Sequence, residues 1–223
     1  GPPIGWFAAG SDERKSTVDL SGLFAHAESA ARDEVPGLVR TIMILLMRGE
    51  PITLEEIETS SRFALETVRE SLKAWRDIEY DDEGRLVGLG LTLRPTEHRF
   101  LIEGRELYTW CALDTLIFPG ILGVRAEVKS ACHATGSPIQ FEVGPEGVRR
   151  LAPESAMVSL VVPGDMTSIR GSFCRQVHFF ASQDAARTWI GEHPGGSVVS
   201  VAEAQRMGLA LAKVRFTAST RCC

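Results

Sequence analysis

The chain has 223 residues, 44% of them apolar, and a formal net charge of -5 from 24 Lys and Arg against 29 Asp and Glu. It is long enough to bury one large core or two small ones, and its acidic balance offers no overall positive field to nucleic acid or to an anionic membrane. The longest purely apolar run, residues 42–47, is far shorter than the roughly 20 residues of a membrane-spanning helix, and no signal-peptide pattern opens the chain. We therefore expect a cytoplasmic protein that binds neither nucleic acid nor membrane.

The first hundred residues are predicted to be mainly helical. Residues 1–19 carry glycine, proline, serine and mixed charge without periodicity, which is typical of a flexible arm. Residues 20–34 favour a short helix, and apolar residues at helical spacing predict another helix over residues 38–47. We expect a winged-helix-like domain over residues 20–104.

Capping signals and a hairpin complete this domain. Thr53-Leu54-Glu55-Glu56 has a hydroxyl and a carboxylate at the spacing of a capping box, which predicts a second helix. Ser60 or Ser61 can cap a third. Residues 78–87 are typical of a strand, an acidic turn and a strand, and period-two alternation continues to Ile102. Three helices followed by a hairpin are the plan of a winged-helix module.

The second half is predicted to be a mixed α/β domain over residues 105–216. A long apolar stretch, residues 107–118, ends at Pro119-Gly120, and the last helix is expected over residues 201–211. Between them, glycine and proline turns separate short strand-like segments at residues 125–130, 139–143, 157–162 and 176–180. The predicted class is α+β, and residues 217–223 are expected to form a flexible tail.

The five cysteines are Cys111, Cys132, Cys174, Cys222 and Cys223. An odd number of scattered cysteines without a CxxC pair is typical neither of a disulfide framework nor of a zinc ribbon, so we expect free thiols. Cys222 and Cys223 follow a polar run, where vicinal thiols can capture a soft metal ion or can equally be incidental.

Cys111 and Asp114 are three positions apart in an apolar stretch. If the stretch is helical, this spacing places thiol and carboxylate on one face, near enough to exchange a proton. Apolar surroundings should raise the pKa of the carboxyl group, so that it can hold a proton near neutral pH. The alternative is a buried core cysteine beside an unrelated helix carboxylate.

The other candidate residues carry weaker signals. Cys174 is followed by Arg175, whose charge can lower the pKa of the thiol, but Cys174 can also be a core cysteine. Cys132 precedes His133, yet adjacent side chains seldom converge on one metal ion, which favours a structural role. His178 lies between apolar residues, where a hydrogen-bonded core histidine is more common than a ligand.

Three motifs, in chain order, resemble the alkylmercury lyases, also called organomercurial lyases. They are Leu107-Tyr108-x-Trp110-Cys111-Ala112-Leu113-Asp114-Thr115-Leu116-Ile117-Phe118-Pro119, Cys132-x-Ala134-Thr135-Gly136-x-Pro138, and Ser172-Phe173-Cys174-x-x-Val177-His178-Phe179-Phe180-Ala181-Ser182. The resemblance covers roughly residues 38–211. It implies a winged-helix-like first domain and a mixed α/β second domain that holds the active site.

The resemblance also implies roles for single residues. Cys111 and Cys174 match the mercury-binding thiols, Asp114 matches the proton carrier, and Cys132 matches a cysteine regarded as structural. Some members have a second cysteine directly after the one matched by Cys174, whereas this chain has Arg175.

We expect no organic cofactor and no resident catalytic metal, because Hg(II) is the product. External thiols should be needed for turnover. A mercuric reductase is a possible acceptor of Hg(II), with Cys222 and Cys223 as a possible relay.

These residue types suit protonolysis of a carbon–mercury bond. Mercury(II) is a soft cation that thiolates bind in preference to harder ligands. We expect Cys111 to attack the metal first while Asp114 accepts its proton, and Cys174 to add second. Asp114 then delivers the proton to carbon as a general acid. A hydrocarbon leaves, and Hg(II) stays on the two sulfurs.

Two alternatives come from other classes of protein. A metal-responsive winged-helix regulator would bind DNA, but the expected recognition stretch, residues 63–76, balances basic with acidic side chains, and the expected wing is acidic. A non-catalytic soft-metal binder would keep the cysteines and would need no proton carrier such as Asp114.

Overall fold

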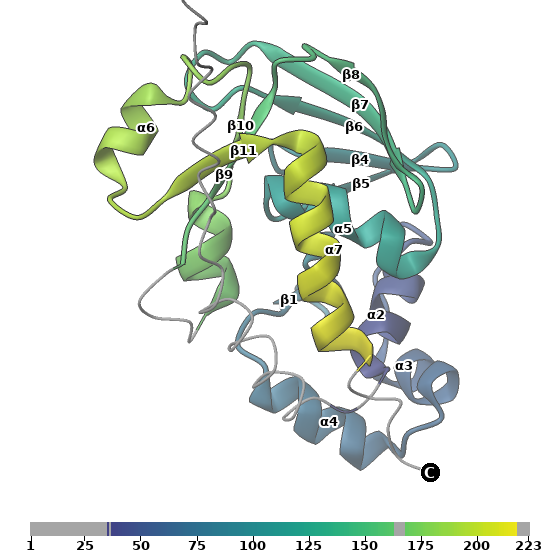
Figure 1. The fold of residues 1–223 in the computed structure, drawn as a ribbon. Coiled ribbons are helices and arrows are strands. Elements are labelled where there is room, and N and C mark those ends of the chain that lie inside the picture. The colour runs from purple at the N-terminus through teal and green to yellow at the C-terminus, as the bar shows by residue number, and fades with distance from the viewer. Residues whose placement is uncertain (1–34, 36, 163–167, 218–223) are drawn as a thin grey trace, which may run out of the picture.

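The structure, a computed structural model, describes residue 35, residues 37–162 and residues 168–217, except for the side chains of residues 214–217 (Figure 1). The predicted arm over residues 1–19 and the predicted helix over residues 20–34 lie outside the described residues, as do Cys222 and Cys223.

The helices of the first part are α2 (Leu38–Leu46), α3 (Leu54–Ser61) and α4 (Leu65–Ala74). The predicted capping box is confirmed: the Glu56 N–H donates to the Thr53 hydroxyl at 3.2 Å, and the Glu56 carboxylate accepts from the Thr53 N–H at 2.9 Å. The predicted cap at Ser60 or Ser61 is wrong, because α3 runs through Ser61 and the N-cap of α4 is Ala64. The first N–H of α4, from Leu65, donates instead to the Glu58 carboxylate of the preceding helix at 3.2 Å.

An antiparallel sheet of eight strands follows, in the order β1-β2-β3-β5-β4-β6-β7-β8. Its strands are β1 (Glu79–Tyr80), β2 (Leu86–Leu89), β3 (Leu91–Thr92), β4 (Arg99–Ile102), β5 (Arg105–Thr109), β6 (Ala126–Ala131), β7 (Pro138–Gly144) and β8 (Gly147–Ala152). The expected hairpin is β1–β2, and the sheet continues across the predicted boundary at residues 104 and 105 through the β4–β5 pair. The sequence did not predict β8, because this edge strand is largely exposed and lacks apolar alternation.

Two helices pack together against one face of this sheet, α5 (Ala112–Leu122) and α7 (Val201–Thr217) (Figure 1). A Cβ atom at Gly208 would lie 2.3 Å from Ile117 Cγ2, so the close approach of the helices requires glycine there. The predicted end at Pro119-Gly120 is wrong: α5 continues to Leu122, and Gly123 ends it with φ 72°. Burial of the apolar side chains on both sides of Pro119 stabilises the helix despite the lost hydrogen bond.

A smaller sheet, in the order β10-β9-β11, lies beside the large one. It consists of β9 (Met157–Leu160), β10 (Phe179–Phe180) and β11 (Ser197–Ser200), with α6 (Arg187–Glu192) between the last two. The segment before β10 forms a π-helical turn, Ile169–Phe173, and a 3-10 turn, Cys174–Gln176, so the strand expected over residues 176–180 shortens to two residues. One apolar core extends from α2 to α7, and the α+β class is confirmed. None of the helices in the described part is long and apolar enough to cross a membrane.

Candidate active site

Cys111, Asp114 and Cys174 lie together although Cys111 and Cys174 are 63 positions apart in the chain (174 − 111). Both Sγ atoms and a carboxylate oxygen of Asp114 are within 4.8 Å of one another. The two cysteines are buried free thiols, and Asp114 is partly exposed. The cluster therefore contains two soft ligands and one group that can carry a proton.

The amino-terminal end of α5 positions two members of the cluster. Cys111 is the N-cap, with φ -145° and ψ 170°, so it is not on the face of the helix as expected. Instead, Cys111 and Asp114 form a capping box: the Asp114 N–H donates to the Cys111 sulfur, and the Asp114 carboxylate accepts from the Cys111 N–H at 3.2 Å. The partial positive charge at a helix amino terminus favours negative charge on both groups.

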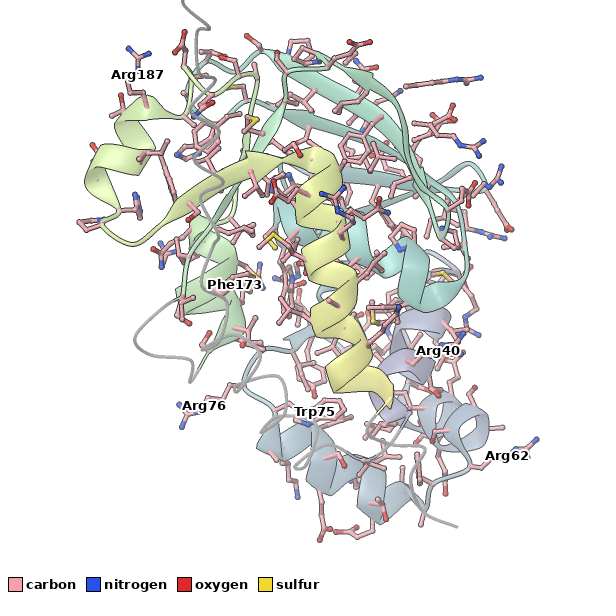
Figure 2. The ribbon with its side chains drawn as sticks, viewed as in Figure 1. Arg40, Arg62, Trp75, Arg76, Phe173 and Arg187 are labelled. Carbon is pink, nitrogen blue, oxygen red and sulfur yellow. The ribbon has the colours of Figure 1, made fainter. Side chains whose placement is uncertain are left out.

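Cys174 begins the 3-10 turn, directly after Phe173, which Figure 2 labels on the neighbouring helical turn. The Ala112 N–H donates to the Val177 carbonyl at 3.3 Å, which joins the start of α5 to the segment after Cys174. Asp77, between α4 and β1, accepts from the Ser168 hydroxyl at 2.7 Å. The Cys174 segment is therefore attached to both halves of the molecule.

Arg170 provides a second attachment. Its guanidinium donates to Glu79 of β1 at 2.6 Å and lies 4.9 Å from the centre of the Trp110 ring. Glu79 is 7% exposed and also accepts from the Thr92 hydroxyl and from Trp110 Nε1. Burial raises the pKa of Glu79, but these hydrogen bonds and the Arg170 charge outweigh burial and lower the pKa below its usual value. An ionised Glu79 thus holds Arg170 beside Trp110, the neighbour of Cys111.

The surroundings raise the pKa of both thiols. Burial, a hydrogen bond with Cys174 and the charge of Asp114 raise the pKa of Cys111 well above its usual value. For Cys174 the hydrogen bond with Cys111 lowers the pKa, but burial and the charges of Asp114 and Asp77 outweigh it, so the pKa is raised overall. The pKa of each thiol is therefore raised, and the hydrogen bond between the two sulfurs couples their ionisation.

Cys132 lies outside this cluster, in the turn between β6 and β7, where it is buried. Burial raises the pKa of Cys132, but hydrogen bonds from the Thr135 hydroxyl and from backbone groups of Ala181, Thr135 and Ala134 lower it below its usual value. These bonds join the turn to residue 181 after β10. The structural role of Cys132 stays a prediction.

Two histidines and a glutamate form another group of metal-ligand atoms. His133 and His178 stack with ring centres 3.8 Å apart, and their nitrogens lie within 4.8 Å of a Glu97 carboxylate oxygen. His178 Nδ1 is buried and has no hydrogen-bond partner in the described part of the chain, whereas a hydrogen bond of the ring with the Arg175 backbone agrees with the expected hydrogen-bonded histidine. No local pattern pointed to Glu97, an exposed acidic residue 36 positions before His133 (133 − 97).

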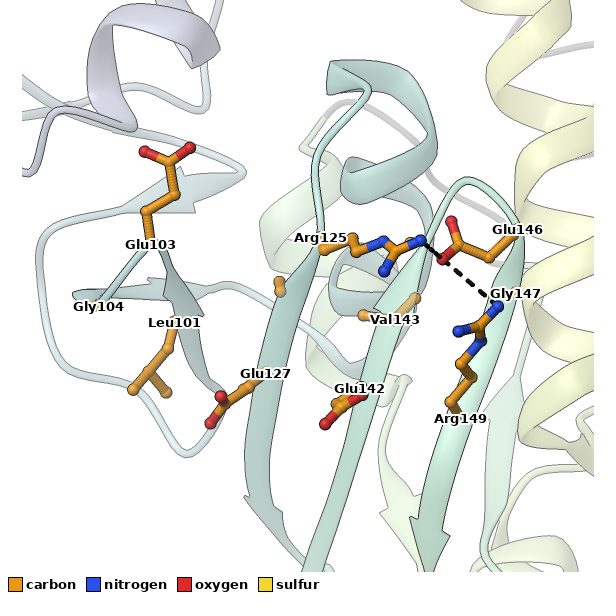
Figure 3. A pocket seen from close by; sticks show the side chains of 12 residues that line it. Leu101, Glu103, Gly104, Arg125, Glu127, Glu142, Val143, Glu146, Gly147 and Arg149 are labelled. Atoms are coloured by element: carbon orange, nitrogen blue, oxygen red, sulfur yellow. Dashed lines mark ion pairs between the residues drawn. The ribbon is translucent and has the colours of Figure 1, made fainter.

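A separate hollow of about 290 Å³ opens on β4, β6, β7 and β8 (Figure 3). Arg125 and Glu146 form an ion pair there at 2.5 Å, and Glu127 and Glu142 also line it. No cysteine or histidine is among its lining residues, so it offers no soft ligand.

Comparison with known protein families identifies the family of the chain that carries the cysteine cluster. Residues 91–213 match the model of the alkylmercury lyase family, and residues 19–90 match the model of the helix-turn-helix domain of alkylmercury lyase. This chain belongs to the alkylmercury lyase family. The family models meet at residues 90 and 91, whereas the sequence predicts a boundary at 104 and 105.

Curated relatives agree with this assignment. An alkylmercury lyase of Streptomyces lividans is 48% identical over 190 residues, which are 84% of this chain and 88% of the relative. Alkylmercury lyases of Bacillus cereus and Pseudomonas putida are 46% and 44% identical, over 77% and 82% of this chain and 78% and 88% of theirs. The lyase therefore cleaves carbon–mercury bonds, as the motifs imply, and nothing favours the regulator or the non-catalytic binder.

A solved structure shares the fold. A crystal structure of the mercury-bound form of MerB2 aligns with a TM-score of 0.72 at 24% identity, covering 90% of this chain and 100% of that chain. Together with the helix-turn-helix match, this confirms the predicted plan of a winged-helix-like first part and a sheet-rich second part in the lyase.

Proposed function

We propose that Cys111 and Cys174 bind the mercury atom of the substrate and that Asp114 carries the proton. The observation that supports this assignment is the position of both sulfurs and the carboxylate within 4.8 Å of one another. Mercury bound by two sulfurs would place its carbon next to the same carboxylate. Neither sulfur alone gives an Hg(II) product two thiolate ligands, so both are needed.

The order of attack is the one expected from the sequence. Asp114 accepts the proton of the Cys111 thiol as the Cys111 sulfur attacks R–Hg–X, forming an Hg–S bond while the Hg–X bond breaks. The Cys174 thiol then gives its proton to the released X⁻ or to solvent, and its sulfur adds to mercury. Two sulfurs donate electron density to the metal, which weakens the Hg–C bond and places negative charge on carbon.

The proton completes the reaction. Asp114 transfers the proton from Cys111 to the carbon as the Hg–C electron pair leaves the metal, so R–H departs and Hg(II) remains on two thiolates. No oxidant or reductant is consumed. The capping hydrogen bond holds Asp114 against the Cys111 backbone, which keeps the carboxylate beside the Cys111 sulfur and the carbon of the bound substrate.

Product release and location are part of the same proposal. Two thiolates hold Hg(II) tightly, so external thiols must exchange with them before the next turnover. We place the lyase in the cytoplasm, where thiols stay reduced, and a mercuric reductase is the partner that would remove Hg(II). Cys222 and Cys223 are the possible relay to it.

Hydrocarbon release from methylmercury in excess thiol tests the assignment. We expect Cys111→Ser and Cys174→Ser each to abolish methane release, because a serine hydroxyl is a poor ligand for soft mercury. Cys222→Ser with Cys223→Ser is the matched control and should still turn over with a small-molecule thiol as acceptor. Full activity of either Cys111→Ser or Cys174→Ser would defeat the proposal.

A further inference from the structure

The histidine pair beside β10 is outside the chemistry assigned to the thiols. His133 lies in the β6–β7 turn, and its N–H donates to the Phe179 carbonyl of β10 at 2.8 Å. His178 is the residue before β10 and lies four positions after Cys174. Glu97 precedes β4 on the neighbouring part of the large sheet. Three separate chain segments thus bring their ligand atoms to one place.

The ligand set has a definite chemical preference. His133 and His178 each offer an imidazole nitrogen and Glu97 offers a carboxylate oxygen, all within 4.8 Å of one another. Two nitrogens and one oxygen suit borderline divalent ions such as Zn²⁺, Co²⁺, Ni²⁺ and Cu²⁺, whereas soft Hg²⁺ prefers the thiols. Glu97 and His133 are exposed, so an ion can reach the site and its remaining coordination positions can hold water.

An unsatisfied nitrogen points independently to a ligand. His178 Nδ1 is buried and has no hydrogen-bond partner in the part of the chain that the structure describes. A buried polar atom without a partner costs free energy, and a bound ion would remove that cost.

The observed rings require one adjustment before they bind an ion together. Metal bonds lie in the plane of an imidazole, but the His133 and His178 rings are stacked with only 16° between their planes. Ligand atoms around one tetrahedral Zn²⁺ lie about 3.4 Å apart, from bonds of roughly 2.1 Å. Binding of one ion therefore requires the exposed His133 ring to rotate and Glu97 to approach, while the less exposed His178 stays in place.

We propose that Glu97, His133 and His178 bind one borderline divalent transition-metal ion of the Zn²⁺ class, at a site separate from the mercury-binding thiols. The bound ion would fasten the segment that follows Cys174 to the β6–β7 turn and to the start of β4. Its role is to stabilise that segment and not to take part in protonolysis.

Cobalt(II) provides a spectroscopic test because it occupies zinc sites and reports its ligands. The parent for the test is the full chain with Cys111, Cys174, Cys222 and Cys223 changed to serine, which removes the competing thiols. We expect one Co²⁺ per chain, with d–d absorption, with no sulfur-to-cobalt charge-transfer band, and with displacement by Zn²⁺. In this parent, His133→Ala and Glu97→Gln should each raise the Kd for Co²⁺ by at least about tenfold.

Matched variants distinguish loss of the proposed metal site from general effects of substitution on the protein. His193→Asn is the control, because the His193 ring stacks on Trp189, its Nδ1 contacts the Trp189 carbonyl at 2.8 Å, and it is not one of the three clustered ligands. It should bind Co²⁺ as the parent does. Zn²⁺ should also raise the Tm of the parent but not of His133→Ala.

Three outcomes would each overturn the proposal. The first is an absence of saturable Co²⁺ binding to the parent, and the second is a sulfur charge-transfer band in its Co²⁺ complex. The third is a Kd for Co²⁺ in the Glu97 and His133 variants equal to that of the parent. None of these results would change methane release by the unmodified lyase, so this test fails or succeeds separately from the mercury assignment.

Discussion

The two thiols of the lyase are held in different ways. Cys111 is 0% exposed, is fixed at the junction of β5 and α5, and shares a capping box with Asp114. Cys174 begins the 3-10 turn directly after the π-helical turn, and polar contacts of Asp77 and Glu79 with Ser168 and Arg170 attach its segment to the rest of the molecule.

This difference shows two ways in which the fold positions a buried thiol. Regular secondary structure fixes one sulfur and the Asp114 carboxylate, since a helix amino terminus allows little variation in geometry. Ion pairs and hydrogen bonds position the other sulfur, and such contacts depend on charge and on the neighbouring domain. Changes on the Cys111 side should affect chemistry, and changes on the Cys174 side should affect positioning and acidity.

The largest effect is expected on the Cys111 side, from Asp114→Asn. The amide keeps the size of the side chain and can still accept from the Cys111 N–H, but it cannot carry a proton. Single-turnover methane release should fall by on the order of 10²–10⁴-fold if proton transfer is limiting. Binding of Hg(II) to the two thiols should persist, and an undiminished rate would remove Asp114 from the mechanism.

On the Cys174 side, Arg170→Gln should reduce turnover by up to about 10²-fold, because misplacement of a reacting group is costly. The Arg170 charge lowers the pKa of Cys174, so its loss should shift the pH profile of Cys174 alkylation upward. An upward shift of this pH profile would show that Arg170 acts on Cys174 through its charge, which a general loss of structure would not reproduce. Arg187→Gln, which removes an exposed ion pair with Asp184, is the control and should leave both measurements unchanged.

The packing of α5 against α7 offers a test by stability. A methyl group at Gly208 would lie 2.3 Å from Ile117 Cγ2, so Gly208→Ala should lower the free energy of unfolding by about 1–3 kcal/mol. Gly191→Ala in α6, where no atom lies within 4 Å of the new methyl group, should instead be neutral or stabilising by up to about 1 kcal/mol. Denaturant unfolding of the two variants measures the contrast, and equal effects would contradict it.

The smallest expected effect is a pH dependence around β10, which follows His178 and whose Phe179 ring packs edge-on against His98. Burial lowers the pKa of His98 to about 3 and that of His178 to about 4. Both folded values are below the usual 6.5, so the stability associated with neutral histidines is complete above about pH 6.5 and declines as the pH falls toward 4. Hydrogen exchange should therefore accelerate over residues 174–180 before it does over α5, and a uniform response would contradict the comparison.

Local signals allowed much of the secondary structure to be predicted. The Thr53 capping box, the β1–β2 hairpin and the helix after Ser200 all depend on residues a few positions apart, and each is present. The failures have physical causes as well. Buried packing carries α5 through Pro119, and Glu58 replaces the expected serine cap of α4 from seven positions away. Tertiary contacts outweighed the local preference at both places.

The sequence by itself determined the family, the residue types of the active site and the pairing of Cys111 with Asp114, since motif and spacing are local properties. Only the tertiary structure decided that Cys174 meets that pair, that Arg170 connects Glu79 to Trp110, and that Glu97 approaches two stacked histidines. The reason is that these contacts join residues far apart in the chain. Their positions follow from strand order and loop closure, which no short sequence pattern specifies.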